Sequence, residues 1–377
     1  MIINRRHLIL SGLSGAGIAL APRIAFAAAE TDRRFIFIIQ RGAADGLTIL
    51  APTGDPAFAS ARGEIAASAS GGSKLNDLFT LHPQLTASAR LFGQKQAAFY
   101  HAIASGYRER SHFDGQNLLE TAGIRPYGRD DGWMNRLLTL IPKGESKALA
   151  MANAIPPALR GPISVGSYAP SRLPDADSAL MERVAMLYAE DPQLAPLWQS
   201  ATQTEAMAGD IDPGNGRGGV AAGKLVASLM AGADGARVAM VETTGWDTHF
   251  NQEGRLGAVL KGVDEMIDTL RTEMGPAWAK TLILVATEFG RTVHVNGTRG
   301  TDHGTASAAM LFGGGLANGG KIIADWPGLA ASQLYEGRDL KPTKRFEAMV
   351  IAALSSHYGI DPEKLRRTVF PDFPDMN

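Results

Sequence analysis

Short apolar runs recur along the chain, and longer stretches in which apolar residues follow a helical period lie between them. The runs are rich in β-branched and aromatic residues and are apolar on both faces, which is typical of buried strands in a parallel sheet. We expect strands at residues 33–40, 97–104, 147–153, 236–243, 280–288 and 306–314.

The stretches between these runs predict helices. The clearest is residues 251–274, where apolar residues recur at three- and four-residue steps and form one stripe. Its members are Leu256, Val259, Leu260, Val263, Met266, Ile267 and Leu270. Residues 175–208, 217–233 and 342–358 also predict helices. Strands that alternate with helices favour an α/β fold in which helices cover both faces of the sheet.

Two polar stretches predict loops. Residues 62–74 indicate a mobile surface loop, and residues 209–219 indicate a flexible one. The letters GNGRGG in the second stretch match G-x-G-x-x-G. No predicted strand precedes them, however, and Pro213 lies just upstream, so we reject a dinucleotide site there.

The N-terminus has the pattern of an export signal. Arg5 and Arg6 form a twin-arginine pair, residues 10–24 are mildly apolar, and residues 25–27 are a small-x-small cleavage sequence. The apolar part is too short and too broken by glycine to span a membrane. We therefore expect residues 1–29 to be a twin-arginine signal peptide, which makes the twin-arginine translocase a partner during export. The alternative is a frayed basic tail.

Composition excludes several classes of protein. The expected signal holds three of the 37 basic residues and no acidic one, so 34 basic residues remain against 38 acidic ones, a net charge of −4. This balance gives no electrostatic footprint for nucleic acid or an anionic membrane. The chain has no cysteine, which excludes disulfides and thiolate metal ligands. Residues 30–377 are long enough to bury a core without them, and we expect a single domain.

Residues that suit catalysis or metal binding follow four of the predicted strands. In open α/β sheets, ligands bind beyond the carboxyl ends of the strands. The residues at these positions are Asp45, Ser111, His112, Asp247, His249, Glu288, Arg291, Asp302 and His303. Carboxylates, imidazoles and a hydroxyl thus meet at one edge of the sheet, which is more than scaffold loops need.

This set predicts a divalent metal site. Carboxylates and neutral imidazoles are the ligands that a cysteine-free chain offers to zinc or manganese, and the histidines argue against calcium or magnesium. A bound cation acidifies water or a serine hydroxyl and creates a nucleophile near neutral pH. Ser111 at a predicted helix start suits the nucleophile, and Arg291 suits a bidentate clamp on a phosphate or sulfate oxygen.

Each of these residues also has an ordinary structural explanation. Ser111 and Asp247 could be helix caps, and Asp302 could belong to a turn. Glu288 could pair with Arg291 in a purely structural contact. The histidines that could simply pack are His82, His101, His112, His294 and His357.

Motifs in order across nearly the whole of residues 30–377 resemble those of an exported bacterial family, the domain-of-unknown-function family 1501, which is grouped with the alkaline-phosphatase-like and sulfatase superfamily. They read RGAADGL, LHPQL, YRERSHFDGQNLLETA, GWMNRLL, GWDTHFNQ, TEFGRT, GTDHG and FGGGLANGGKIIADWPGL. The resemblance implies a three-layer αβα sandwich with a mostly parallel sheet and a metal site at the carboxyl edge of that sheet.

The superfamily resemblance also implies roles for single residues. Asp45 takes the place of an early aspartate ligand, and Ser111 that of the nucleophile. The chain departs from the superfamily pattern in having Asp247-x-His249 where Asp-x-x-x-His is usual, and its later Asp-His pair comes 14 residues after a strand end instead of directly at it. Because there is no cysteine and HFDG follows Ser111, the formylglycine motif of the sulfatases is absent.

These observations predict an exported, periplasmic or secreted, metal-dependent hydrolase of small anionic phosphate or related esters. The expected metal ligands are Asp45, Asp247, His249, Glu288, Asp302 and His303, with Asp302 as a ligand or as the group that orients one. Ser111 or a metal-bound water would attack, and Arg291 would steady the oxyanion. One alternative is a non-catalytic binding or assembly module with a structural metal. Another is a surface protein with carbohydrate partners, for which the chain offers only five tryptophans.

Overall fold

The computed structural model describes residues 32–141, 148–169, 178–195, 198–199, 202 and 218–373. The expected signal peptide over residues 1–29 and most of the expected loop over residues 209–219 lie outside these ranges. Within them, the structure contains no helix with the length and apolar character needed to cross a membrane.

A nine-stranded sheet forms the centre of the molecule. Its strands, in order across the sheet, are β11 (Ile322–Ile323), β5 (Ala97–Ala104), β10 (Ser307–Phe312), β9 (Thr281–Ala286), β1 (Arg34–Gln40), β8 (Val238–Thr243), β6 (Ala148–Met151) and β7 (Gly166–Ser167), with β12 (Lys344–Arg345) paired to β5. β1 pairs in parallel with both β8 and β9, whereas β10 is antiparallel to both of its neighbours. All six strands expected from the sequence are present, and the mostly parallel sheet is confirmed.

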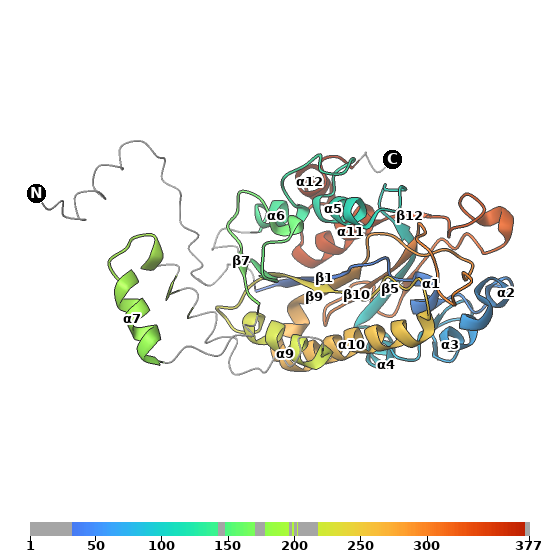
Figure 1. Ribbon diagram of the computed structural model, residues 1–377, viewed down its shortest axis with the longest axis horizontal. Helices are drawn as coiled ribbons and strands as arrows, with labels where there is room; N and C mark the ends of the chain where they lie inside the picture. The colour runs from blue at the N-terminus through green and yellow to red at the C-terminus, as the bar shows by residue number, and fades with distance from the viewer. Residues whose placement is uncertain are drawn as a thin grey trace, which may run out of the picture.

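Helices cover both faces of this sheet (Figure 1). One layer holds α4 (Thr86–Gly93), α9 (Gly219–Met230) and α10 (Gln252–Glu273), and the other holds α5 (His112–Thr121), α6 (Trp133–Leu138), α11 (Phe346–Tyr358) and α12 (Pro362–Val369). The alternation along β1 explains this, because Ile36 and Ile38 pack in the core of the first layer while Phe35, Phe37 and Ile39 pack in the core of the second. The three-layer αβα architecture is therefore confirmed.

The expected helices agree with the structure, with two differences. The described part of 175–208 contains α7, which runs over Ser178–Tyr188, and residues 194–195, 198–199 and 202 are also helical, so a break at residues 189–193 divides the expected helix. The helix expected at 342–358 begins only at Phe346, because residues 344 and 345 are extended and pair with β5 as β12. Short 3-10 helices also lie between these elements, among them η3 (Pro157–Leu159), η4 (Gly275–Lys280) and η5 (Ala331–Gln333).

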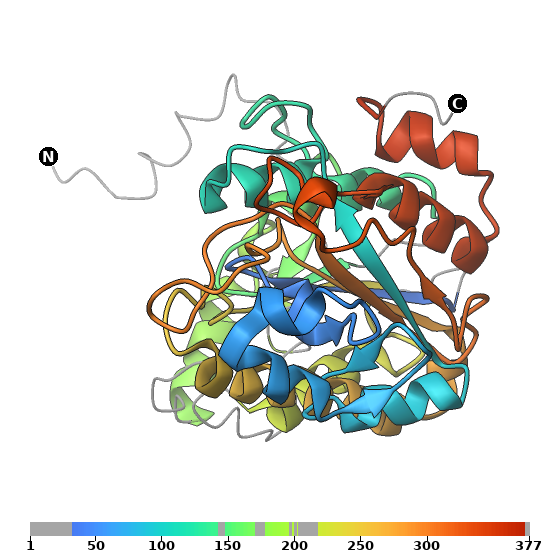
Figure 2. The same ribbon diagram turned by 90° about the vertical axis from the view of Figure 1, so that its right-hand side faces the viewer.

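Small elements at one end of the sheet lie toward the viewer in Figure 2. They are α1 (Gly46–Ile49), β2 (Leu50–Ala51), α2 (Phe58–Arg62), η2 (Gly63–Ile65), α3 (Ala66–Ser70), β3 (Ser73–Lys74) and β4 (Thr80–Leu81). The expectation of a mobile loop over 62–74 is wrong, since most of that stretch is helical. Ile65, Ala66 and Ala69 are buried there, so apolar packing holds the segment in place.

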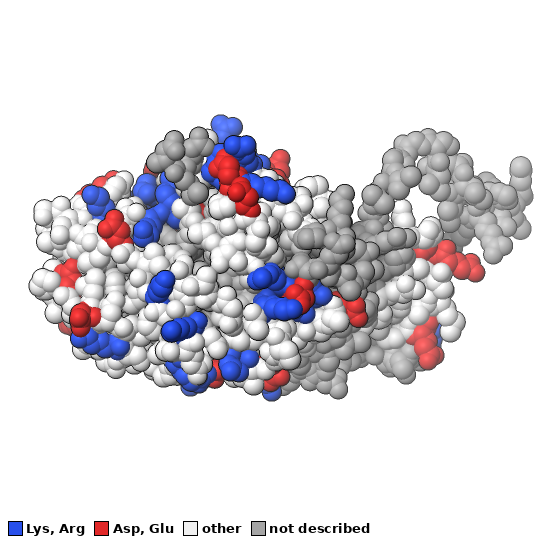
Figure 3. Space-filling view, turned by 180° about the vertical axis from the view of Figure 1, so that it is seen from behind, with Lys and Arg blue, Asp and Glu red and all other residues white. Residues whose placement is uncertain are grey.

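Charged side chains of both signs are interspersed on the face of the molecule in Figure 3. This face shows no broad area of one sign among the described residues, which agrees with a formal net charge of −1 for the whole chain. Neither the balance of charge nor its distribution on this face resembles a nucleic-acid footprint.

Candidate metal centre

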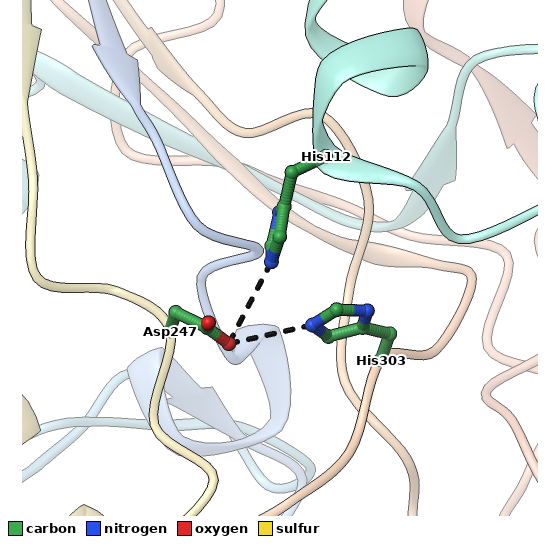
Figure 4. A group of neighbouring side chains, drawn as sticks. All are labelled: His112, Asp247 and His303. Atoms are coloured by element: carbon green, nitrogen blue, oxygen red, sulfur yellow. Dashed lines mark hydrogen bonds and ion pairs between the residues drawn. The ribbon is translucent and has the colours of Figure 1, made fainter.

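Three connections beyond the carboxyl ends of strands converge on one point. The connection after β5 delivers His112 as the first residue of α5, and the one after β8 delivers Asp247 and His249. The connection from β9 to β10 delivers His303. Because β10 runs antiparallel to β9, this last connection leaves and re-enters the sheet at the same edge. Figure 4 shows how His112 and His303 reach toward the Asp247 carboxylate from two sides.

The ligand atoms of His112, Asp247 and His303 all lie within 4.8 Å of one another. Asp247 Oδ1 is 3.6 Å from His112 Nε2 and 3.4 Å from His303 Nε2 (Figure 4). His249 Nε2 approaches the same oxygen at 3.0 Å and lies 3.0 Å from His303 Nε2. Four ligands about 2.0–2.1 Å from a tetrahedral zinc ion are about 3.3 Å from one another. The contacts of Asp247 with the three imidazoles, at 3.0–3.6 Å, are close to this separation. His112, Asp247 and His303 form the compact group, and His249 borders it through Asp247 and His303.

The three imidazole rings share one arrangement, in which Nδ1 is bound to an acceptor and Nε2 faces the Asp247 oxygen. The three Nδ1 contacts are His112 to Glu288 Oε1 at 2.8 Å, His249 to Asp302 Oδ1 at 3.0 Å, and His303 to the Arg110 carbonyl oxygen at 2.9 Å. Carbonyl and ionised carboxylate oxygens only accept hydrogen bonds, so each Nδ1 carries the proton. In its neutral form each ring then presents an Nε2 lone pair, which is the form that binds metal.

A bound cation would relieve the repulsion between the side chains of this cluster. Without one, imidazole lone pairs face one another and a carboxylate oxygen at 3.0–3.6 Å. His112 Nε2 is buried and has no hydrogen-bond partner among the described residues. Additional protons could relieve the repulsion, and the hydrogen bond to Glu288 does raise the pKa of His112. Burial, however, lowers the pKa of His303, as do the nearby His112 and Arg291 charges, so an additional proton on His303 is disfavoured.

Asp247 is the common point of the cluster and stays ionised. Burial alone would raise its pKa, but the hydrogen bond and charge of Arg291 bring the pKa below its ordinary value. The turn after β1 passes close to this residue: a Cβ at Gly42 would lie 2.7 Å from the Asp247 amide nitrogen, and Gly42 has a φ of +118°. The tight turn therefore needs glycine to let Asp247 approach. The helix that Asp247 could have capped begins at Gln252 with Asn251 in the cap position, so that alternative is wrong.

Glu288 orients a ligand instead of binding the ion directly. Its side chain is 0% exposed, and Oε1 accepts hydrogen bonds from the Gly42 amide at 2.8 Å, from Gln116 at 2.9 Å and from His112. Oε2 accepts one from Thr287 at 2.9 Å. Burial opposes ionisation, yet the bonds to His112 and Gln116 hold the pKa of Glu288 below its ordinary value. The structure thus places Glu288 behind His112. The expected pairing of Glu288 with Arg291 is not among its contacts.

Asp302 occupies the same kind of position behind His249. Its Oδ1 accepts from His249 Nδ1 and from Asn296 Nδ2 at 3.2 Å. Between the two roles expected for Asp302, the geometry therefore corresponds to the group that orients a ligand.

Asp45 lies apart from the cluster, which corrects its expected role as a ligand. It caps α1, is 1% exposed and forms a buried ion pair with Arg62. Its Oδ2 also accepts hydrogen bonds from Thr48 Oγ1 at 2.8 Å and from Gln252 Nε2 at 2.5 Å. The physical reason is that the carboxylate is buried among other partners: Oδ1 accepts from the Leu47 amide at 3.2 Å, and Oδ2 is shared by Arg62, Thr48 and Gln252.

Ser111 stands directly before His112 in the N-cap position of α5, but its side chain makes no capping bond. Its backbone N–H donates to the Tyr107 hydroxyl at 3.0 Å, and the two hydroxyls also contact each other. Ser111 therefore lies next to the cluster in the chain, and Tyr107 fixes the position of its backbone.

Arg291 is fixed by the protein and does not offer a free clamp for an oxyanion, which corrects the second expected catalytic role. Its guanidinium contacts are with the carbonyl oxygens of Gly42, Ala43, Trp246 and Thr301, with Asp247 Oδ1 and with His249 Nε2. These contacts use every nitrogen of the group.

His112 is the functional residue that sequence reasoning missed as a ligand. It follows Ser111 at a helix start after a strand, which is a suitable place, but packing was an equally valid interpretation of one histidine there. The deciding contact is with Glu288, 176 positions away along the chain. No sequence pattern pairs these two residues.

The fold and the cluster define an α/β protein with a candidate histidine–aspartate metal centre at the carboxyl edge of its sheet. Residues 167–366 match the model of the family described as "Protein of unknown function (DUF1501)", and the chain belongs to this family. A search of curated proteins found no match.

Several solved structures are similar to this chain at low sequence identity. The lipoteichoic acid synthase LtaP from Listeria monocytogenes is 10% identical with a TM-score of 0.40, and the match covers 79% of this chain and 70% of that one. Alkaline phosphatase from the Antarctic bacterium TAB5 is 13% identical with a TM-score of 0.36, covering 77% and 94%. The C-terminal periplasmic domain of EcEptC from Escherichia coli, in complex with Zn, is 7% identical with a TM-score of 0.32, covering 78% and 76%. With TM-scores below 0.5, none of these likenesses supports an argument about the activity of this chain.

Proposed function

We propose that this protein is an exported metal-dependent hydrolase of phosphate or related esters. The observation that carries the proposal is the set of three imidazole rings whose Nδ1 atoms are tied to acceptors while their Nε2 atoms face one carboxylate oxygen at 3.0–3.6 Å. Such a set is costly to hold together unless a cation lies within it, and the tethers behind the ligands are the kind that tune metal sites.

His112, Asp247, His249 and His303 would hold the ion. An imidazole-rich set with one carboxylate favours zinc over magnesium or calcium. When bound, such an ion polarises an ester oxygen and stabilises developing negative charge. Because Asp247 and His249 are roughly half-exposed, at 47% and 42% of their side-chain surfaces, a small anionic ester can reach the ligands from solvent.

Ser111 is the candidate nucleophile that the chain itself supplies, and Tyr107 is its hydrogen-bond partner. Burial raises the pKa of the Tyr107 hydroxyl, so this hydroxyl stays protonated near neutral pH and cannot take a proton from Ser111. It holds the Ser111 backbone in place instead. Water remains the alternative nucleophile, and a Ser111→Ala variant separates the two.

The twin-arginine pattern at Arg5 and Arg6 supports export to the periplasm or beyond, with the translocase as a transient partner. Export in a folded state would allow the ion to be loaded before the chain leaves the cytoplasm.

The test compares the zinc-loaded protein with Asp247→Asn on a panel of phosphate monoesters and diesters. We expect hydrolysis by the wild type and a loss of at least about 100-fold in the variant, because losing a ligand should cost no less than losing a group that orients one. Asp77→Asn, which changes a fully exposed carboxylate, is the control. An Asp247→Asn variant as active as the control would end the assignment.

A non-catalytic module with a structural metal is the second candidate. The observation that favours it is that Arg291 has no donor left for a substrate oxyanion. In that case a chelator should lower the melting temperature markedly while no ester is turned over.

A further inference from the structure

The structure places a buried positive charge directly beside the candidate metal ligands. The Arg291 side chain is 0% exposed. Its Nη2 donates to Asp247 Oδ1 at 2.5 Å, the same oxygen on which the histidines converge, and its Nη1 lies 3.5 Å from His249 Nε2. The guanidinium therefore shares two ligands with any ion bound in the cluster.

The position of Arg291 is determined by backbone carbonyl groups. Nε donates to the Ala43 oxygen at 2.9 Å, Nη1 to Thr301 at 3.2 Å, and Nη2 to Trp246 at 3.1 Å and Gly42 at 3.3 Å. These carbonyls belong to the connections after β1 and β8 and to the connection between β9 and β10. A guanidinium carries five N–H donors and no acceptor, and these four carbonyl oxygens together with Asp247 Oδ1 supply five acceptors. Arg291 can neither turn toward substrate nor leave.

The guanidinium already stands where a second ion would approach the shared ligands. Arg291 Nη2 lies 2.5 Å from Asp247 Oδ1, and Nη1 lies 3.5 Å from His249 Nε2. A second divalent ion on this side would lie beside a buried positive charge, which is unfavourable.

Two of the carboxylates expected as ligands are engaged elsewhere. Asp45 is paired with Arg62, and Glu288 is 0% exposed, with its Oε1 accepting from Gly42, Gln116 and His112. Six residues were expected to ligate metal from the sequence, but the described part of the chain contains one compact group of potential ligands, His112, Asp247 and His303.

We propose that the centre binds a single divalent ion and that Arg291 is a permanent second cation, which fixes the Asp247 carboxylate and occupies the place that a second ion would need. The inference rests on the proposed metal site. It assigns Arg291 a positioning role, since the side chain acts on the ion through Asp247 and through the loops whose carbonyls it binds.

The first test is the number of zinc ions bound by the full chain. Metal-free protein is titrated with zinc in a calorimeter, and bound zinc is measured by elemental analysis after gel filtration. We expect one zinc per chain. Two zinc ions per chain would overturn this inference and leave the proposed metal-dependent function standing. No bound zinc at all would overturn the proposed site itself, so the two failures are distinguishable.

The second test uses Arg291→Lys, which keeps the charge but loses the planar fork that holds Asp247 and the carbonyls together. We expect one zinc per chain with an affinity about 10- to 100-fold lower, and an altered visible absorption spectrum of the cobalt(II)-substituted protein. Arg90→Lys, a surface arginine paired with Asp268 on the α10 side, is the matched control and should change neither.

An Arg291→Lys variant with wild-type zinc affinity and an unchanged cobalt spectrum would overturn the positioning role. Should this variant fail to fold, the zinc count of the wild-type protein still decides whether the site takes one ion or two.

Discussion

At the scale of single residues, the candidate centre depends on which nitrogen of each imidazole is held. Each of the three imidazole rings forms a hydrogen bond through Nδ1. The acceptor is a buried carboxylate for His112, an exposed carboxylate for His249 and a backbone carbonyl for His303. The ring orientation that metal binding requires is therefore present before an ion binds, so less conformational entropy is lost on binding.

Replacing Glu288 by glutamine tests this arrangement. The amide keeps an oxygen for the Gly42 N–H but loses the charge that holds His112, so we expect zinc affinity to fall about 10- to 100-fold. Competition with a chromogenic chelator measures the change. Glu265→Gln, an exposed position on α10 paired with Lys261, is the control. If Glu288→Gln and Glu265→Gln bind zinc equally well, the tie between Glu288 and His112 has no role in metal binding.

At the scale of secondary-structure elements, a buried polar network joins three helices next to the centre. Asp45 caps α1, Arg62 is the last residue of α2, and Gln252 is the first residue of α10. Gln252 also accepts hydrogen bonds from Thr248 at 2.9 Å and Thr301 at 2.6 Å. These two threonines lie within the connections that carry the ligands. The network therefore fixes the walls of the site without belonging to it.

We expect Asp45→Asn to destabilise the protein by about 3–5 kcal/mol, because it leaves the buried Arg62 guanidinium without its counter-charge. The number of bound zinc ions should stay the same. Urea denaturation and elemental analysis give the two values. A folded Asp45→Asn variant that had lost its zinc would show that Asp45 is a ligand after all.

The expectation for Asp45 failed for a reason that lies in the neighbouring element. The strands could be predicted because residues such as Ile38 and Phe37 are apolar on both faces, and the edge where the ligands meet follows from parallel strand direction. The pairing of Asp45 with Arg62 depends instead on the helices α2 and α3, in a stretch interpreted as a mobile loop. Sequence periodicity is weak over such short helices, so the partner that takes the carboxylate was not apparent.

The same reasoning explains why His112 was missed. Which carboxylate stands behind which histidine is set by the relative placement of β5, β8 and β9, and one sequence holds no signal for contacts between them. The sequence therefore predicted the edge of the sheet and most of the residue types there, but not the division between ligands and the groups that orient them.

At the scale of the whole molecule, three histidines outside the centre make stability depend on pH. Burial lowers the pKa of His82, His101 and His357 to about 4. His101 Nε2 lies 3.1 Å from the Gly46 oxygen and 3.0 Å from the Leu50 oxygen, while its Nδ1 accepts from the Ala102 amide at 2.7 Å. A proton on Nδ1 would face an N–H group, so the folded state keeps His101 neutral.

Because the pKa of His101 is lower in the folded than in the unfolded chain, its contribution is fully present above about pH 6.5 and is lost as the pH falls toward 4. We expect the unfolding free energy of the chelator-treated protein to drop by up to about 3 kcal/mol over this range through His101 alone. Urea denaturation at several pH values measures it. In His101→Gln the drop should shrink, and an equal drop in this variant would assign the effect to other groups.

The reversed direction of β10 has a consequence for how this centre can change. A helical crossover from β9 would have carried the chain to the opposite edge of the sheet. Because β10 is antiparallel to β9, the connection instead begins and ends at the edge that holds the ligands. One uninterrupted segment, residues 287–306, thus carries Glu288, Arg291, Asp302 and His303 between two anchored ends. Insertions or exchanges within that segment can remodel ligand and cation together while the strand pairing on either side stays intact, so the chemistry of this edge can diverge faster than the architecture that supports it.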